Sequence, residues 1–240
     1  GRIRNMSNGG DTVNLLGQPI GPAMPGWTAP PRPQRATLPG RYCRLEPLDS
    51  SRHAADLHAA NSLDREGRMW TYLFSGPFAT LDEFTAWLES REDSLDPLYF
   101  AIVDAGTSRA TGIASYLRIE PAHGTIEVGH LAFSPLLQRT AAATEAMYLM
   151  MKHAFELGYR RYEWKCDALN AASRRAAERL GFMFEGIFRQ AVVYKGRNRD
   201  TAWYSIIDSE WAERETAFLA WLDPANFDSD GRQRRSLQGT

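Results

Sequence analysis

The stretch QRTAAATEAM, residues Gln138 to Met147, places three consecutive alanines at the beginning of a predicted helix, directly after a predicted strand. The first amide groups of a helix have no partner within it, and the helix dipole gives that end a partial positive charge. Small side chains let phosphate oxygens reach those amides, and Arg139, Thr140 and Thr144 add a cation and two hydroxyl groups. The stretch therefore predicts a pyrophosphate-binding cradle, although alanine is also a good helix former without any ligand.

The composition is that of an ordinary soluble domain. The chain has 240 residues, of which 43% are hydrophobic and 24% are charged, and 28 Lys and Arg nearly balance 29 Asp and Glu. Because no large field of one sign is expected, nucleic acid is not predicted as a partner. The two cysteines form no disulfide framework, which fits a cytoplasmic location. No apolar run is long enough for a membrane helix, and no metal-ligand spacing is present.

The chain divides into three predicted regions. Residues 1–39 form a Gly/Pro-rich arm that is either loose or docked through Ile20, Met24 and Trp27. Residues 40–225 form one domain, and residues 226–240 form a polar tail that we expect to be disordered. We expect Met6 to be the native start, with residues 1–5 an added segment.

Hydrophobic periodicity predicts the elements of the domain. We expect helices over residues 50–61 (capped by Ser50 or Ser51), 79–90, 141–157, 171–180 and 209–222. We expect strands at residues 41–48, 160–166, 182–194 and 200–208, and three more within residues 97–135. The order is β-α-α-β-β-β-α-β-α-β-β-α, which predicts a mixed α/β or α+β sheet with helices on its faces.

Four pieces of the chain resemble one family in their order and spacing. They are the cradle at 138–146, KCDALNAASRRAAERLGFMFEG at 165–186, the hairpin YKGRNRDTAWYSII at 194–207, and TIEVGHLAFSP at 125–135. Together, residues 40–210 resemble the GNAT superfamily of N-acetyltransferases, and within it the RimJ/RimL-type branch of ribosomal-protein N-terminal acetyltransferases. That family's cradle is Gln/Arg-x-x-Gly-x-Gly/Ala, and Ala141 stands here where glycine is usual.

The resemblance implies the acyl-CoA N-acyltransferase fold, a mostly antiparallel sheet with a splayed parallel strand pair and helices on both faces. It also implies acetyl-CoA as the cofactor. The pantetheine arm would fill the gap between the splayed strands, and Asn170 and Ser173 would approach the thiol. For both residues a plain role at a helix start is the alternative. The expected cofactor-binding residues are Leu131, Ala132, Phe133, Gln138, Arg139, Thr140, Ala141, Ala142, Ala143, Thr144, Asn170 and Ser173.

Acetyl transfer needs a neutral amine and a proton for the leaving thiolate. The resemblance makes Glu127 the first candidate for the base, and a structural charge paired with a neighbouring strand is the alternative. His130 titrates in the right range but is more often structural at such a position. The tyrosine that many GNAT enzymes use as the acid is missing, since Ala176 and Ala177 occupy that region, so the Ser173 hydroxyl is the expected acid.

The acceptor is predicted to be a primary amine. Trp70 and Tyr72, in a loop over the pocket, and Tyr204, in the final strand, are the expected acceptor-binding residues, and aromatic side chains suit a peptide or an apolar amine. The predicted acceptors are a protein N-terminus or a small amine metabolite or antibiotic, bound by a monomer or homodimer. Two alternatives remain: a degenerate GNAT domain that binds CoA as a sensor or scaffold, and an unrelated domain whose alanine-rich helix is only core.

Overall fold

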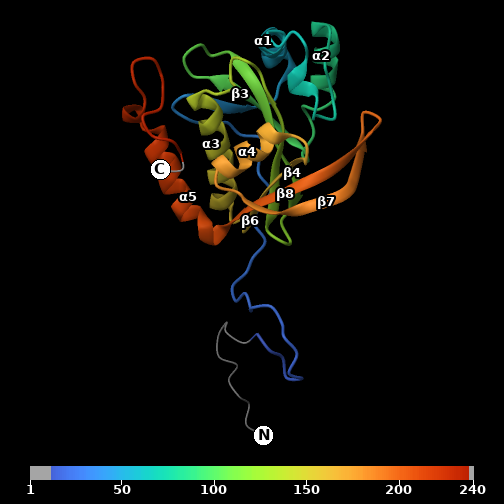
Figure 1. Cartoon of the computed structure of the whole chain (residues 1–240), viewed down its shortest axis with the longest axis vertical. Coiled ribbons are helices and arrows are strands. Elements are labelled where there is room, and N and C mark those ends of the chain that lie inside the picture. The colour runs from blue at the N-terminus through green and yellow to red at the C-terminus, as the bar shows by residue number, and fades with distance from the viewer. Residues whose placement is uncertain (1–11, 238–240) are drawn as a thin grey trace.

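A computed structural model describes residues 12–237, so Met6 and residues 1–5 lie outside the described part of the chain. Eight strands form one sheet in the order β1-β2-β3-β4-β5-β6-β8-β7 (Figure 1). Neighbouring strands are antiparallel except for the parallel pair β5–β6. The strands are β1 (Leu38–Pro39), β2 (Cys43–Pro47), β3 (Leu98–Asp104), β4 (Ala110–Glu120), β5 (Thr125–Phe133), β6 (Arg161–Asp167), β7 (Met183–Tyr194) and β8 (Arg197–Ile207).

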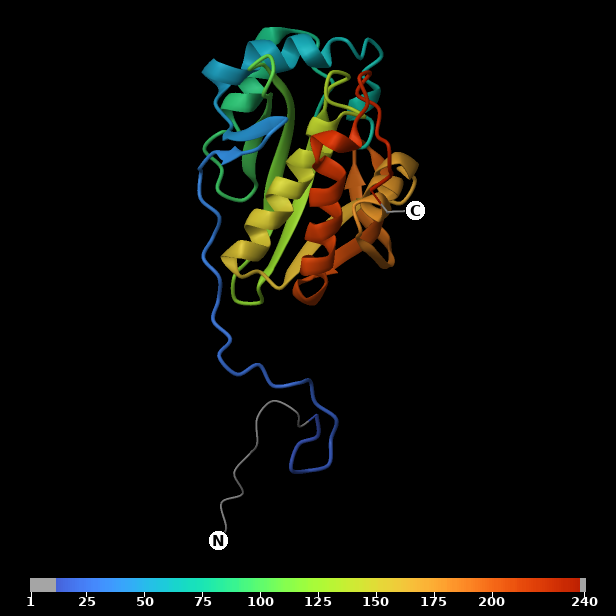
Figure 2. The same ribbon diagram turned by 90° about the vertical axis from the view of Figure 1, so that its left-hand side faces the viewer.

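Helices cover both faces of the sheet, as Figures 1 and 2 show. They are α1 (Ser50–Asn61), α2 (Leu81–Glu89), α3 (Ala141–Leu157), α4 (Ala171–Arg179) and α5 (Asp208–Leu222), with short 3-10 helices η1 (Arg68–Trp70) and η2 (Pro224–Asn226). The predicted fold class and the predicted order of elements are confirmed. The short strand β1, which lies within the predicted arm, was not expected.

Strand β3 is apolar from Leu98 to Val103 because this part of it is buried on both faces. Phe100 and Ile102 belong to the hydrophobic core beneath α3 and α5. Tyr99, Ala101 and Val103 point the other way, into a second core beneath α1 and α2. Side chains alternate across a strand, so one run of apolar residues fixes the two helical layers on opposite sides of the same sheet.

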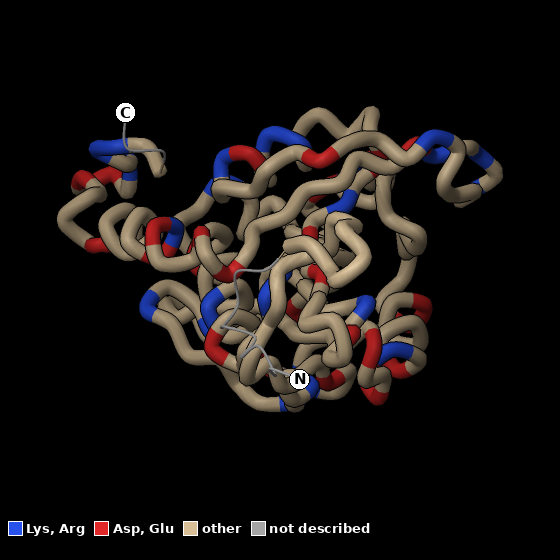
Figure 3. The backbone as a smooth tube through the Cα atoms, turned by 90° about the horizontal axis from the view of Figure 1, so that it is seen from below, with Lys and Arg blue, Asp and Glu red and all other residues tan. Residues whose placement is uncertain are grey.

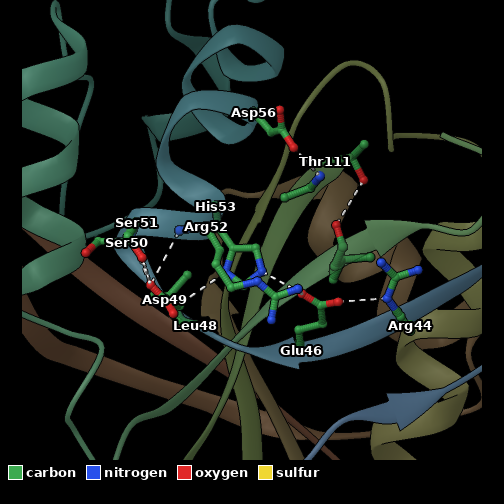
Figure 4. Close-up of polar contacts among 12 residues, drawn as sticks. Arg44, Glu46, Leu48, Asp49, Ser50, Ser51, Arg52, His53, Asp56 and Thr111 are labelled. Carbon is green, nitrogen blue, oxygen red and sulfur yellow. Dashed lines mark hydrogen bonds and ion pairs between the residues drawn. The ribbon is translucent and has the colours of Figure 1, made fainter. Parts of the chain in front are cut away.

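A buried polar network joins α1 to β2 (Figure 4). The carboxylate of Glu46 lies 2.7 Å from Arg44 Nε and 2.8 Å from His53 Nε2. The backbone amide of Asp49 donates to His53 Nδ1 at 3.0 Å, which leaves Nε2 as the donor to Glu46. The side chain of Asp49 accepts from the amides of Ser51 and Arg52, so the cap of α1 is Asp49, and the prediction of Ser50 or Ser51 is wrong.

Glu145, in α3, anchors the beginning of the first long strand. Its buried carboxylate accepts hydrogen bonds from the backbone amides of Arg41 (3.0 Å), Tyr42 (2.8 Å) and Cys43 (3.0 Å). Hydrogen bonds from amides to a carboxylate are stronger than those between neutral groups. This one side chain therefore fixes β2 against α3, the helix that begins at the cradle.

Both terminal regions pack partly against the domain. A Cβ at Gly124 would lie 2.5 Å from the Trp27 ring, so glycine lets the arm dock there. Ile20 and Met24 remain exposed, and the arm extends away from the domain (Figure 2). At the other end, Asn226 donates side-chain hydrogen bonds to the carbonyl groups of Trp221 and Arg235. These contacts join the described part of the tail to the end of α5, while residues 238–240 lie outside the described part, and the expected disorder of the tail stays a prediction.

Charged residues of both signs are interspersed along the backbone rather than gathered by sign (Figure 3). Within residues 12–237, no helix has the length and apolar character needed to cross a membrane.

Replacing Glu145 with alanine should destabilise the protein by roughly 3 kcal/mol, because three amides at the start of β2 lose a charged acceptor. Glu145→Gln, which keeps one acceptor oxygen, should lose less. The matched control is Glu156→Ala, because Glu156 is exposed on the same helix and, among residues 12–237, its ion-pair partner is Lys152 alone. Urea unfolding measures all three variants, and equal losses for Glu145→Ala and Glu156→Ala would contradict the anchoring role.

Candidate active site

The two parallel strands pair over only part of their length. Paired positions extend from Thr125 opposite Arg161 to Val128 opposite Trp164, and beyond these the two strands are not paired. Beyond that point β5 carries a bulge, where its register with β4 shifts and His130 has a φ of 50°. A bulge bends its strand and ends regular pairing. A gap therefore opens between β5 and β6 at the level where α3 begins.

A cleft of about 2160 Å³ occupies this gap. Its lining includes the beginning of α3 and one side of α4 on one face of the sheet. On the other face it includes the 68–74 loop and residues of β7 and β8. The volume exceeds the roughly 300–1000 Å³ of a pocket for one small ligand, so two substrates have room to meet through the sheet.

The alanine run begins helix α3, where the sequence predicts a helix start. Thr140 caps α3, and its Oγ1 accepts from the amide of Ala143 at 3.2 Å. The amides of Ala141 and Ala142 donate no hydrogen bond to any residue in the described part of the chain. They lie at the positive end of a 17-residue helix, so they are free to bind an anion. Arg179 of α4 adds a cation nearby, since its Nη1 donates to Thr144 Oγ1 at 3.0 Å.

In β5, the side chains of the three residues expected to bind the cofactor alternate between the two faces of the sheet. Leu131 and Phe133 line the cleft, whereas the Ala132 side chain is buried in the core beneath α1 and α2. Ala132 therefore offers only backbone groups to the gap. Gln138 Nε2 donates to the carbonyl oxygen of Phe133 at 2.7 Å, so the cradle glutamine holds the end of β5 in place.

Asn170 and Ser173 both line the cleft, and both also serve α4 itself. The Asn170 side chain caps the helix by accepting from the amide of Ser173 at 3.2 Å. The Ser173 hydroxyl accepts from Trp164 Nε1 at 3.1 Å and hydrogen bonds with the Cys166 thiol. Burial raises the pKa of Cys166, although this hydrogen bond partly opposes the shift. The hydroxyl is thus fixed beside the gap.

Glu127 faces the cleft but is paired. Its carboxylate lies 2.9 Å from Lys165 Nζ on β6, and both side chains are buried. Burial raises the pKa of Glu127, and the Lys165 charge only partly opposes this. Lys165 also lies 3.8 Å from the centre of the Trp203 ring. The arrangement gives Glu127 the paired role that the sequence left as its alternative, at a place where a substrate can still reach it.

His130 sits at the bulge with its ring nitrogens uncommitted. Its ring lies between Phe74 and Tyr99, at centroid distances of 6.2 Å and 5.8 Å, and makes no hydrogen bond to the described residues. Burial lowers its pKa, and the positive charges of Arg91 and Arg199 lower it further. A histidine in this environment is neutral at pH 7 and can accept a proton.

The three expected acceptor residues are not brought together. Tyr72 lines the cleft. Trp70 does not, because its ring packs against Phe78 and Trp87 in the core beneath α2. Tyr204 is fully buried on the opposite side of β8, where its hydroxyl accepts from Arg174. Only Tyr72 therefore keeps a position from which it can contact an acceptor.

Sequence reasoning expected the final strand at the cleft but chose the wrong face of it, through Tyr204. Arg199, Thr201 and Trp203 line the cleft, and Phe188 of β7 stacks on Trp203 at 4.2 Å. The signal was the period-two pattern of RDTAWYSI, in which alternate residues share a face. Within the described residues, no cluster of His, Cys, Asp and Glu is arranged to hold a metal ion.

Replacing Arg199 with glutamine should raise the pKa of His130, because one of the two positive charges that lower it is removed. NMR titration of the His130 ring in the two proteins measures the shift. Arg91→Gln should act in the same direction, and Arg197→Gln, a change at an exposed residue, is the control. An unchanged His130 titration in Arg199→Gln would place the two residues too far apart to interact.

Comparison with known proteins agrees with this geometry. The family model described as Acetyltransferase (GNAT) domain matches residues 43–183. The curated ribosomal-protein-serine acetyltransferase of Escherichia coli (strain K12) is 33% identical over 101 residues, which is 41% of this chain and 56% of that protein. The aligned region thus spans about half the length of that curated relative.

Two solved structures resemble nearly the whole domain. A GCN5-related N-acetyltransferase from Brucella melitensis is 50% identical with a TM-score of 0.88, covering 90% of this chain and 98% of that one. A probable acetyltransferase (GNAT family) from Chromobacterium violaceum is 43% identical with a TM-score of 0.75, covering 81% and 98%. The prediction of the GNAT family is confirmed, and the chain belongs to the GNAT family of acetyl-CoA-dependent N-acetyltransferases. The similarity to a ribosomal-protein-serine acetyltransferase agrees with the predicted RimJ/RimL-type branch.

Proposed function

We propose that this enzyme acetylates a primary amine, either a protein N-terminus or a small amine metabolite or antibiotic. The observation that carries the proposal is the continuous cleft through the β5–β6 gap, which joins the cradle on one face of the sheet to an aromatic-walled region on the other. The resemblance to a ribosomal-protein-serine acetyltransferase supports a protein N-terminus as acceptor. The cytoplasmic location and the monomer or dimer state stay predictions.

The cradle fits the pyrophosphate of acetyl-CoA. Its amides at Ala141 and Ala142 have no partner in the described chain, and three alanines leave the approach open. Arg139 and Arg179 would add positive charge. The unpaired edge of β5 at Leu131 would meet the pantetheine arm as a neighbouring strand.

Acetyl-CoA supplies a thioester whose carbonyl carbon is open to attack by a neutral amine. On the cradle face, the Ser173 hydroxyl can give a proton to a leaving sulfur, because it is fixed beside the gap by Trp164. On the opposite face, Glu127 and the neutral His130 are the groups able to take the proton that the amine must lose. Lys165 holds the Glu127 carboxylate in place. If Glu127 is the base, a water molecule would therefore carry the proton from the amine to this carboxylate.

The ion pair of Glu127 gives weight to one alternative, a domain that binds CoA without catalysis as a sensor or scaffold. Calorimetric titration with acetyl-CoA, followed by thiol release with a panel of amines and N-terminal peptides, separates the two. Binding with release supports the enzyme. Binding without release for every acceptor supports the sensor, and absence of binding removes both.

Ala143→Asp should weaken acetyl-CoA binding by roughly 100-fold or more, because a carboxylate would face the phosphates at short range. The matched control is Ala143→Asn, which has nearly the same shape without the charge and should bind far better. Calorimetry gives the affinities, and thermal unfolding checks that both variants fold. Similar affinities for Ala143→Asp and the unchanged protein would rule out the cradle as the phosphate site.

Ser173→Ala should lower kcat by about 100-fold, the usual size of an acid–base contribution, and change acetyl-CoA affinity little. Ser173→Thr keeps the hydroxyl and should recover part of the rate. Stopped-flow thiol release and calorimetry give the two quantities. A full rate in Ser173→Ala would remove this hydroxyl from the mechanism.

A further inference from the structure

One buried cation in the cleft has no carboxylate partner in the described part of the chain, whereas three other cations of the sheet do. Lys165 pairs with Glu127, Arg161 pairs with Glu163 and Glu185, and Arg44 pairs with Glu46. Arg199 is only 9% exposed, yet no carboxylate in the described part of the chain lies within ion-pair distance of it. Burial of an unpaired charge is costly, so this guanidinium calls for an explanation.

The guanidinium of Arg199 is held in place but leaves donors unused. Its Nε donates to Thr201 Oγ1 at 3.1 Å. Its central carbon, Cζ, lies 5.5 Å from the centre of the Phe74 ring and 5.8 Å from the centre of the Tyr194 ring. Its other nitrogens donate no hydrogen bond to a described residue. The nearby carboxylate of Asp167 is already engaged by the Tyr194 hydroxyl and the amide of Leu169.

Arg199 lies on the face of the sheet opposite the cradle. In β8, Ala202, Tyr204 and Ile206 point into the core beneath α3. Arg199, Thr201 and Trp203 alternate with them and line the other side of the cleft. The phosphate site at α3 is therefore not what Arg199 faces, and the ligand that reaches it must enter from the acceptor side.

The geometry points to Arg199 as the binding site for a carboxylate carried by the acceptor amine. An arginine presents a planar fork of donors that matches a carboxylate with two parallel hydrogen bonds. Phe74 and Tyr194 orient the fork, and the Phe74 ring also lies against the His130 ring at a centroid distance of 6.2 Å, so the guanidinium lies near the bulge where the gap opens. The preferred acceptors are thus amines with a nearby carboxylate.

Two sources present this chemistry: a free amino acid or similar small amine, and a peptide whose N-terminus is followed by an acidic side chain. The inference rests on the proposed function in one respect, because that function is what makes the carboxylate-bearing ligand the acceptor amine. The free donors of the Arg199 guanidinium, which no described carboxylate engages, do not depend on catalysis, so carboxylate binding can be measured separately from turnover.

The kinetic experiment compares acceptors in matched pairs. Glycine and β-alanine are each tested beside their carboxamides, and Ala-Asp amide is tested beside Ala-Asn amide. The unchanged protein should show a higher kcat/KM for the carboxylate member of at least one pair, and the pair that responds identifies the source. Arg199→Gln should lower that kcat/KM about 10- to 100-fold, as expected for a hydrogen-bonded charge, and leave the amide member within about twofold.

Arg199→Lys keeps the charge but loses the fork, so it should recover only part of the preference. Arg197→Gln, on the same strand but exposed, is the matched control and should leave every ratio unchanged. Equal losses for both members of each pair in Arg199→Gln would reduce Arg199 to a structural role. A loss of acetyl-CoA affinity in the same variant would make it a cofactor contact, and either result overturns the inference.

A binding experiment separates this inference from the proposed function. Saturation with the carboxylate ligand should raise the pKa of His130 in the unchanged protein, because the ligand neutralises the Arg199 charge. The carboxamide should have no such effect, and neither ligand should act in Arg199→Gln. If the shift occurs without any transfer, only the proposed function fails. If no carboxylate shifts the His130 titration, the site assignment fails, whatever the turnover.

Discussion

The parallel pairing of β5 and β6 ends after Val128 and Trp164, and the groups able to act on a ligand are arranged around that point. Strands that stop pairing leave backbone groups unsatisfied, which is tolerated only where something else binds them. Here the bulge at His130 bends β5 away while β6 continues alongside β8. The resulting gap passes through the sheet, so a ligand on one face can meet a ligand on the other.

The helix α3 makes this gap useful because it begins at the same level. Its first amides point out of the helix with no partner in the described chain, and its alanines leave room in front of them. The same helix carries Glu145, whose carboxylate binds three amides at the start of β2. One helix therefore both offers the anion site and ties it rigidly to the sheet, as a preorganised site requires.

Charge is distributed differently on the two faces of the gap. The cradle face has helix amides with Arg139 and Arg179, which suits the phosphates of a nucleotide cofactor. On the acceptor face, Glu127 and Lys165 neutralise one another, whereas Arg199 keeps an uncompensated charge among aromatic rings. The two faces of the gap thus differ in charge as well as in position, and the carboxylate proposal follows from that difference.

The sequence by itself determined the local features. Periodicity and turn residues predicted the helices and strands of the domain and their order, and the alanine run predicted the anion cradle, because both depend on residues close together in the chain. The GNAT resemblance added the splayed pair and the cofactor. Only the tertiary structure decided which side of a strand faces the cleft. It buried Trp70 and Tyr204, paired Glu127 with Lys165, folded residues 226–237 back onto α5, and left Arg199 with no carboxylate partner among the described residues. These outcomes depend on contacts between residues far apart in the sequence, where packing and ion pairing, rather than local pattern, set the free energy.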